Sequence, residues 1–258
     1  MLGAIAGDII GSVYENVPAA RADFPLFGPR STPTDDSVLS VAVAEAALSG
    51  GDYRDALRRW ARRYPDAGYG AGFARWVQAD DPPDGDSFGN GAAMRVSPIG
   101  WLFDDEDAVL DAARASARPS HGHPDALNAA QAVALAVFLA RRAIARDDLR
   151  LRLGLSFGYD LDRDYEAVRA AHRPDTSARG SVPEALIAFL TSCDFEDAVR
   201  RAVRLGGDAD TQACIAGAVA EAYYGGVPTP IATAARERLP DDMAAVLDRF
   251  SAHRRPMP

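Results

Sequence analysis

Two acidic stretches far apart in the chain carry side chains that could bind a hard divalent cation. Thr34-Asp35-Asp36 lies near the start of the sequence, and Asp208-Ala209-Asp210-Thr211 lies near its end. Carboxylates and hydroxyls, without a neighbouring His or Cys, form the ligand set that Mg²⁺ prefers. Each stretch precedes a helix-like sequence, so helix capping is a competing explanation for either one taken alone. Together the two stretches predict a metal-dependent enzyme.

The second stretch carries the stronger argument. It follows Gly206-Gly207 and precedes a run of small apolar residues, 213–218, which we expect to be a buried helix. Two carboxylates at a buried helix start are costly unless they are paired or metal-bound. An EF-hand is excluded, because its sixth position would be Ala213 rather than Gly and its twelfth Val219 rather than Glu.

A glycine-rich segment offers a way to bind an anion. In Ser87-Phe88-Gly89-Asn90-Gly91 the glycines leave backbone N–H groups open to close approach by a phosphate. Phe88 could stack on a base, and Arg95 could pair with a negative charge. An ordinary Gly-Asn-Gly turn is the alternative interpretation.

Three further side chains are candidates for acid–base or hydrogen-bonding roles. His121 and His123 lack a third soft ligand, so we interpret them as structural or substrate-contacting groups rather than as a metal site. Glu15 ends the polar face of the first predicted helix and could be a general acid or base. A solvated surface glutamate is the alternative for Glu15.

Helical periodicity predicts the elements that position these side chains. No stretch alternates apolar and polar residues as a strand would. We therefore predict an all-α fold that forms a single domain over residues 1–258. Ser181-Val182-Pro183-Glu184 has the form of a capping box that would start a helix, after an irregular stretch over 159–180. Helices are predicted over 2–13, 38–48, 52–64, 125–144, 195–205, 211–224 and from 230 to the C-terminus, with an apolar run over 92–103.

Composition limits the class of protein. The chain has 258 residues, of which 48% are hydrophobic and 25% charged, values that exclude a disordered or collagen-like protein. The net charge of −9 argues against broad nucleic-acid binding, although not against a small anionic ligand. We expect no membrane span and no signal peptide, and hence a cytoplasmic protein. Cys193 and Cys214 are expected to be buried free thiols.

Five short motifs occur in one order along most of the chain, and together they resemble the ADP-ribosylglycohydrolase family. Any one of them is unspecific, whereas five in order are highly specific. They are Gly7-Asp8-x-x-Gly11-Ser12-Val13-Tyr14-Glu15, Thr34-Asp35-Asp36, the segment from Phe88 to Val96, Ser120-His121-Gly122-His123, and Gly207-Asp208-Ala209-Asp210-Thr211.

The resemblance implies a compact all-α fold of orthogonal helices with a pair of Mg²⁺ ions, for which Mn²⁺ or Ca²⁺ could substitute. The implied metal ligands are Thr34, Asp35, Asp36, Asp208, Asp210 and Thr211. ADP-ribose would lie in the cleft, with His121 near its ribose and phosphates and Phe88 as an adenine platform. The other implied substrate contacts are Ser87, Gly89, Asn90, Gly91, Met94 and Arg95.

The resemblance also implies an activity, the release of ADP-ribose from a modified protein or small molecule. Glu15 would act as the catalytic acid or base, with Asp36 and Asp210 orienting the nucleophile together with the metal. The Gly-Ser-x-Tyr-Glu form around Glu15 favours the branch that acts on O-linked ADP-ribose, notably on serine. We expect a monomer. The alternatives are a non-catalytic ADP-ribose binder or structural protein on the same scaffold, and another Mg²⁺-dependent pyrophosphate hydrolase.

Overall fold

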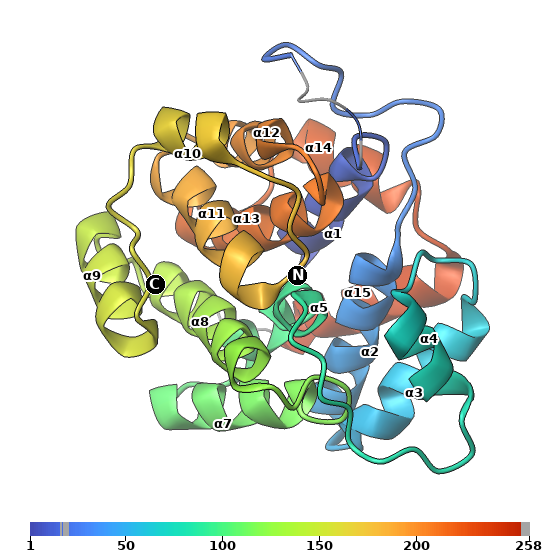
Figure 1. Cartoon of the computed structure of the whole chain (residues 1–258). Helices are drawn as coiled ribbons and strands as arrows, with labels where there is room; N and C mark the ends of the chain where they lie inside the picture. The colour runs from blue at the N-terminus through green and yellow to red at the C-terminus, as the bar shows by residue number, and fades with distance from the viewer. Residues whose placement is uncertain (16, 18–20, 254–258) are drawn as a thin grey trace.

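The chain folds as a set of packed helices, which confirms the all-α prediction (Figure 1). The computed structural model describes residues 1–15, 17 and 21–253, and within these ranges there is no strand. The helices of the first half are α1 (Leu2–Gly11), α2 (Asp35–Ser49), α3 (Tyr53–Arg63), α4 (Ala71–Gln78), α5 (Gly91–Met94), α6 (Ser97–Leu102) and α7 (Glu106–Ala117). Those of the second half are α8 (Pro124–Arg141), α9 (Arg146–Phe157), α10 (Tyr165–Ala171), α11 (Ala178–Leu190), α12 (Phe195–Leu205), α13 (Ala209–Tyr223), α14 (Thr229–Arg236) and α15 (Asp241–His253).

Helices α1 and α13 lie against each other at the centre of the fold, and glycines allow their close contact. Gly3, Gly7 and Gly11 recur every four residues on the face of α1 that meets α13. A Cβ atom on Gly7 would lie 2.0 Å from the carbonyl oxygen of Ala213, and one on Gly11 would lie 2.4 Å from the Cα atom of Asp210. The two backbones therefore touch where larger side chains would hold them apart.

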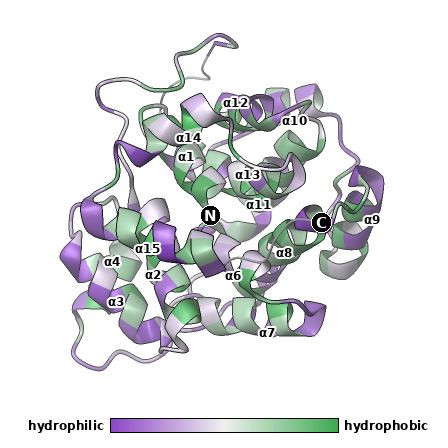
Figure 2. Cartoon of the chain, turned by 180° about the vertical axis from the view of Figure 1, so that it is seen from behind, coloured by the Kyte–Doolittle hydropathy of each residue, from purple (hydrophilic) through white to green (hydrophobic). Residues whose placement is uncertain are grey.

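The other helices enclose this pair on several sides. In Figure 1, α2, α3, α4 and α15 lie on one side and α7, α8 and α9 on another, while α11 and α12 pack on α13. Most of α8 is buried, as predicted for the long alanine-rich segment. Hydrophilic residues lie mainly on the outward faces of peripheral helices such as α3 and α9 (Figure 2). None of the described helices is long and apolar enough to cross a membrane.

Local capping signals set the start and end of α2, which carries the first acidic stretch. Thr34 is the N-cap residue, and its hydroxyl oxygen accepts from the backbone N–H of Asp36 at 3.3 Å. Gly50 ends the helix in the left-handed conformation at φ 66°. Both boundaries agree with the sequence prediction.

The predicted capping box at Ser181 is wrong. Helix α11 begins one turn earlier, at Ala178, and the hydroxyl of Ser177 accepts from the N–H of Gly180. The Ser181 hydroxyl instead donates to the Ser177 carbonyl from inside the helix. The stretch predicted to be irregular also contains α10.

Other boundaries differ because of proline and of short amphipathic segments. The predicted run over 92–103 is divided into α5 and α6 near Pro98, which cannot donate a helical hydrogen bond. Besides α10, three helices were not predicted, namely α4, α7 and α9. The last predicted helix is divided into α14 and α15, and its expected end at residues 254–258 lies outside the described residues.

Both cysteines are free, as predicted, but only Cys214 is buried. Cys193 is exposed because it lies in the turn between α11 and α12 rather than within a helix.

Candidate active site

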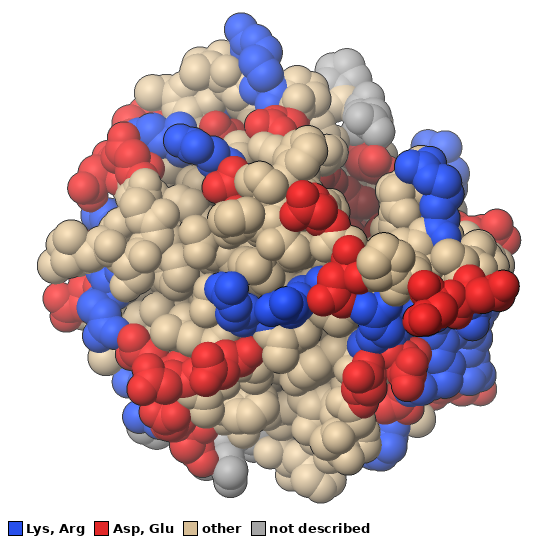
Figure 3. Space-filling model, turned by 60° about the horizontal axis from the view of Figure 1, so that its bottom comes forward, with Lys and Arg blue, Asp and Glu red and all other residues tan. Residues whose placement is uncertain are grey.

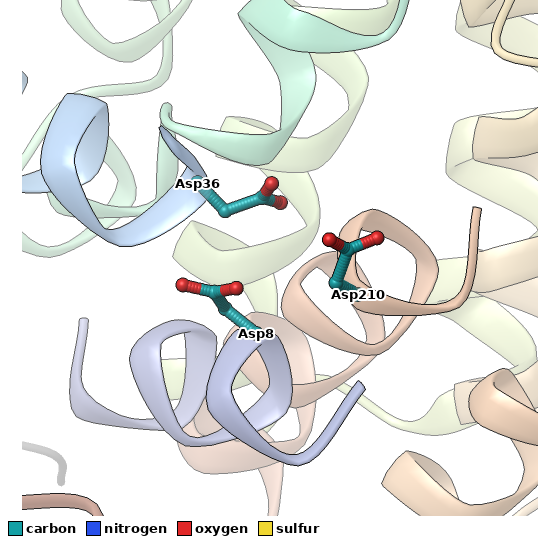
Figure 4. A group of neighbouring side chains, drawn as sticks. All are labelled: Asp8, Asp36 and Asp210. Carbon is teal, nitrogen blue, oxygen red and sulfur yellow. The ribbon is translucent and has the colours of Figure 1, made fainter. Parts of the chain in front are cut away.

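Three buried carboxylates from three different helices meet at one point (Figure 4). Asp8 comes from α1, Asp36 from the first turn of α2 and Asp210 from the first turn of α13. One oxygen of each lies within 4.8 Å of the others. The close contact between α1 and α13 brings Asp8 to the start of α13, so the cluster depends on the glycine face of α1.

Burial and mutual repulsion raise the pKa of these carboxyl groups. For Asp36, burial is the main cause, followed by the charges of Asp8 and Asp210, and the pKa lies well above its usual range. The pKa of Asp210 is also well above its usual range, through burial and then the charge of Asp208. Burial raises the pKa of Asp8 to about 6 despite hydrogen bonds from Ser37 and Thr34. A cation would relieve this repulsion.

The donor set fits a hard divalent cation. Asp36 Oδ1 is buried and has no hydrogen-bond partner among the described residues, although a buried carboxylate oxygen is normally satisfied. Its Oδ2 lies 3.3 Å from the hydroxyls of both Thr34 and Thr211. These oxygens belong to both acidic stretches, and a cation among them would satisfy the unpartnered oxygen.

Asp35 and Asp208 lie at the edge of the buried cluster. Both are half-buried and line the same cavity. Burial, and then the charges of Asp8 and Asp208, raise the pKa of Asp35 to about 7. Asp208 is held in place by the side-chain amide of Asn90, which donates to it at 2.6 Å.

A cavity of about 640 Å³ opens above these acids and is large enough for a dinucleotide-sized ligand. Its wall includes every residue predicted as a metal ligand. Every predicted substrate contact except Phe88 lines it as well. The chain therefore brings nearly all of the predicted site residues to one cavity.

Glu15 lies at the exposed part of the cavity wall, beyond the end of α1. Its charge contributes to the raised pKa of Asp210, after burial, Asp208 and Asp8. It also contributes to the raised pKa of Asp35, after burial and the same two acids. The Glu15 carboxylate is thus near the acids yet open to solvent, a suitable position for an acid or base that meets a substrate.

The glycine-rich segment positions neighbouring side chains of the site. The side-chain amide of Asn90 donates to Ser181 and Asp208, and its backbone N–H donates to the carbonyl of Thr176. Asn90 therefore positions Asp208 in the absence of substrate, and its contact with substrate stays a prediction. A Cβ atom on Gly91 would lie 3.0 Å from Nε2 of His121, so Gly91 makes room for that ring.

His121 and Arg95 form a buried polar floor. The His121 ring lies 2.8 Å from the Ser120 hydroxyl through Nδ1. Burial, and then the charge of Arg95, hold the pKa of His121 well below its usual range, so its imidazole is neutral at pH 7. Arg95 donates to the Ser120 hydroxyl and the Ser116 carbonyl, while its Nε and Nη1 have no hydrogen-bond partner in the part of the chain that the structure describes. Burial lowers the pKa of Arg95 to about 9, which leaves it charged at neutral pH.

Phe88 and His123 lie outside the cavity wall. The Phe88 side chain is 61% exposed, and its ring meets the edge of His123 with centroids 6.1 Å apart. His123 caps α8 by accepting from the N–H of Asp125 at 3.2 Å, which agrees with the structural role predicted for it. The predicted adenine platform is therefore a surface ring beside the cavity rather than part of its wall.

Sequence reasoning missed two parts of the site. Asp8 was recognised as part of a motif, but its place in the acidic cluster was not predicted. The wall formed by Gly68 and residues 70–73 was also missed. The dense glycines of Gly68-Tyr69-Gly70-Ala71-Gly72 were the available signal for that wall.

Comparisons with known proteins agree with this arrangement. The family model described as ADP-ribosylglycohydrolase matches residues 1–256. The chain is 28% identical over 305 residues to the ADP-ribosylhydrolase ARH3 of Homo sapiens, covering 87% of this chain and 84% of that protein. The ARH3 protein of Mus musculus is equally similar, with 82% of its length covered. A solved structure titled ADP-ribosylglycohydrolase-related protein complex superimposes with a TM-score of 0.74 and 30% identity, covering 98% of this chain and 96% of that one.

Proposed function

Because the chain belongs to the ADP-ribosylglycohydrolase family and is therefore a glycosidic hydrolase, we propose that it is a Mg²⁺-dependent enzyme acting on O-linked ADP-ribose. The substrate class we favour is ADP-ribose attached to serine. Hydrolysis would break the bond between C1″ of the distal ribose and the acceptor oxygen, and release free ADP-ribose. The form of the motif that ends at Glu15 supports the O-linked acceptor.

The observation that carries the proposal is the unpartnered Oδ1 of Asp36, buried at the base of a cavity lined by both acidic stretches. We propose that Thr34, Asp35, Asp36, Asp208, Asp210 and Thr211 hold two Mg²⁺ ions there. When bound, the ions would neutralise the acids and fix the hydroxyls of the distal ribose. Mn²⁺ or Ca²⁺ could substitute.

The residues of the chain then divide the work of a glycoside hydrolysis. Glu15 protonates the leaving oxygen or removes a proton from the attacking water, as the transition state gains oxocarbenium character. Asp36 and Asp210 orient the nucleophile from the base of the cavity. Neutral His121 can donate or accept a hydrogen bond with the ribose or phosphates without placing a second charge beside Arg95.

A panel of defined linkages tests the proposed substrate class. Peptides ADP-ribosylated on serine or arginine, ADP-ribosylated nucleic-acid ends, O-acetyl-ADP-ribose and poly(ADP-ribose) would be incubated with wild-type and Glu15→Gln protein. We expect the fastest release of ADP-ribose from the serine linkage. Faster release from arginine would contradict the O-linked assignment while leaving the family activity intact.

Product analysis separates the proposal from its alternatives. A pyrophosphate hydrolase would yield AMP, whereas the proposed reaction yields intact ADP-ribose. A non-catalytic binder would bind ADP-ribose without turnover.

We also expect a cytoplasmic monomer without broad affinity for nucleic acid. The face in Figure 3 supports the last point, since basic and acidic side chains are interspersed there without a continuous basic surface. Light scattering would test the expected monomer. A gel-shift assay with duplex DNA would test the expected lack of nucleic-acid binding.

A further inference from the structure

We propose that Asp8 is a positioning residue that accepts a hydrogen bond from the Thr34 hydroxyl and fixes the first turn of α2, so that Thr34 and Asp36 keep free lone pairs for a cation. The inference rests on the proposed function, in which these two residues bind Mg²⁺. In this role Asp8 does not bind the metal directly, although its carboxylate lies within the acidic cluster (Figure 4).

Within the described part of the chain, the hydrogen bonds to the Asp8 carboxylate all come from the start of α2. Its Oδ1 accepts from the Thr34 hydroxyl at 2.7 Å. Its Oδ2 accepts from the backbone N–H groups of Thr34 at 3.0 Å and Ser37 at 3.1 Å, and from the Ser37 hydroxyl. A carboxylate has about four lone-pair sites, so these four donors occupy most of its capacity. Asp8 therefore acts from α1 as a second cap on α2.

The direction of the Thr34 O–H bond decides whether the hydroxyl oxygen has a lone pair available for a cation. A threonine hydroxyl has one proton and two lone pairs. Thr34 Oγ1 lies 2.7 Å from Asp8 Oδ1 but 3.3 Å from Asp36 Oδ2, so the proton points to Asp8. One lone pair of Thr34 faces the N–H of Asp36, and the other stays available on the cavity side.

Loss of Asp8 would change the hydrogen bonding of Thr34 and Asp36, the two proposed metal ligands. Without its acceptor on α1, the Thr34 hydroxyl would turn its proton to Asp36 Oδ2, the next nearest acceptor. This bond would occupy a lone pair that the cation needs and aim a proton into its site. The start of α2 would also lose its three other hydrogen bonds to Asp8, which fix Asp36 relative to α1.

The competing assignment makes Asp8 a direct metal ligand. In that case Asp8 and Thr34 would contribute to affinity separately, and their losses would multiply in a double variant. If Asp8 acts through Thr34, the second substitution adds little to the first. A double-mutant cycle therefore distinguishes the two assignments.

Isothermal titration with Mg²⁺ alone measures the cycle, using wild-type protein, Asp8→Asn, Thr34→Val and the double variant. Asp111→Asn, an exposed position on α7, is the matched control and should bind as wild type. We expect each single substitution to weaken Mg²⁺ binding about 10- to 100-fold, as is usual for groups that orient ligands. The double variant should be within about threefold of the weaker single variant. Wild-type affinity in Asp8→Asn, or multiplied losses in the double variant, would overturn the inference.

If circular dichroism shows that Asp8→Asn does not fold, Ser37→Ala tests the role of Asp8 instead. It removes one donor to Asp8 at a buried position and leaves every proposed ligand in place. We expect Mg²⁺ affinity to fall about fivefold, the effect of one hydrogen bond, and unchanged affinity would overturn the inference. Failure of the wild-type protein to bind Mg²⁺ would instead contradict the proposed function, and the inference with it.

Discussion

Replacing Gly11 by alanine should destabilise the protein and reduce its activity, although alanine is the better helix former. A Cβ atom at position 11 would lie 2.4 Å from Asp210 Cα and 2.6 Å from the carbonyl oxygen of Ala209. Ordinary contact begins near 3.4 Å, so α1 and α13 must separate by about 1 Å. The atoms in the way belong to the backbone, and no side-chain rotation can relieve the overlap.

The magnitude follows from two opposing effects. Overpacking against backbone costs about 3 kcal/mol, the upper part of the usual range, and alanine returns about 1 kcal/mol of helix propensity. The net loss of about 2 kcal/mol corresponds to a fall in Tm of roughly 4–8 °C in a protein of this size. The displacement occurs at Asp210, so turnover of a serine-linked ADP-ribosyl peptide should fall about 100-fold.

Thermal unfolding and steady-state turnover measure the two effects. Gly28→Ala is the matched control, because a Cβ atom there meets no described atom within 4 Å, and it should leave both quantities unchanged. An unchanged or higher Tm in Gly11→Ala, together with full turnover, would refute the argument that backbone contact between α1 and α13 builds the site.

Three further substitutions test individual residues. Glu15→Gln should lower turnover at least 100-fold while ADP-ribose affinity and Tm stay near wild type, since Glu15 is exposed; normal turnover would remove it from the mechanism. His121→Gln should flatten the acid side of the stability profile measured in urea at pH 7.5 and 5.5. The pKa of His121 is lowered in the folded state, so the free energy of unfolding of the wild-type protein should fall by up to about 1.4 kcal/mol per pH unit as the pH drops below about 6.5. An equal fall in the variant would contradict this reasoning. Asp36→Asn should raise the metal-free Tm at pH 8 by several degrees, because the raised pKa means that the charged form costs stability there, and it should abolish the further rise on adding Mg²⁺; a fall in the metal-free Tm would oppose this view.

Local signals made much of the site predictable from sequence. Thr34 and Gly50 mark the ends of α2 by their own capping preferences, so the position of Asp36 in a first helical turn required no knowledge of the tertiary fold. The same holds for Asp210 behind its glycine turn. Both acidic stretches therefore indicate carboxylates in the first turn of a helix from local sequence alone.

Contacts between distant segments account for what sequence reasoning missed. Asp8 meets Asp210 because α1 lies directly against α13, and it reaches Thr34 and Ser37, 26 and 29 residues away, because α2 also packs on α1. The glycines at positions 3, 7 and 11 were a visible sign of such packing, yet they do not specify the partner helix. Ser177 and Ser181 show a related difficulty, because both can cap a helix and the wrong one had the better local pattern.

The most direct test of the account follows free ADP-ribose released from a serine-ADP-ribosylated peptide by the wild-type protein. The reaction would be run in Mg²⁺, then with EDTA, and then with excess Mg²⁺ restored. The account predicts release of intact ADP-ribose, loss of release with EDTA and recovery with Mg²⁺. Release that continues in EDTA, or AMP in place of ADP-ribose, would contradict the proposal that the acids of α2 and α13 form the metal site of an ADP-ribosylhydrolase.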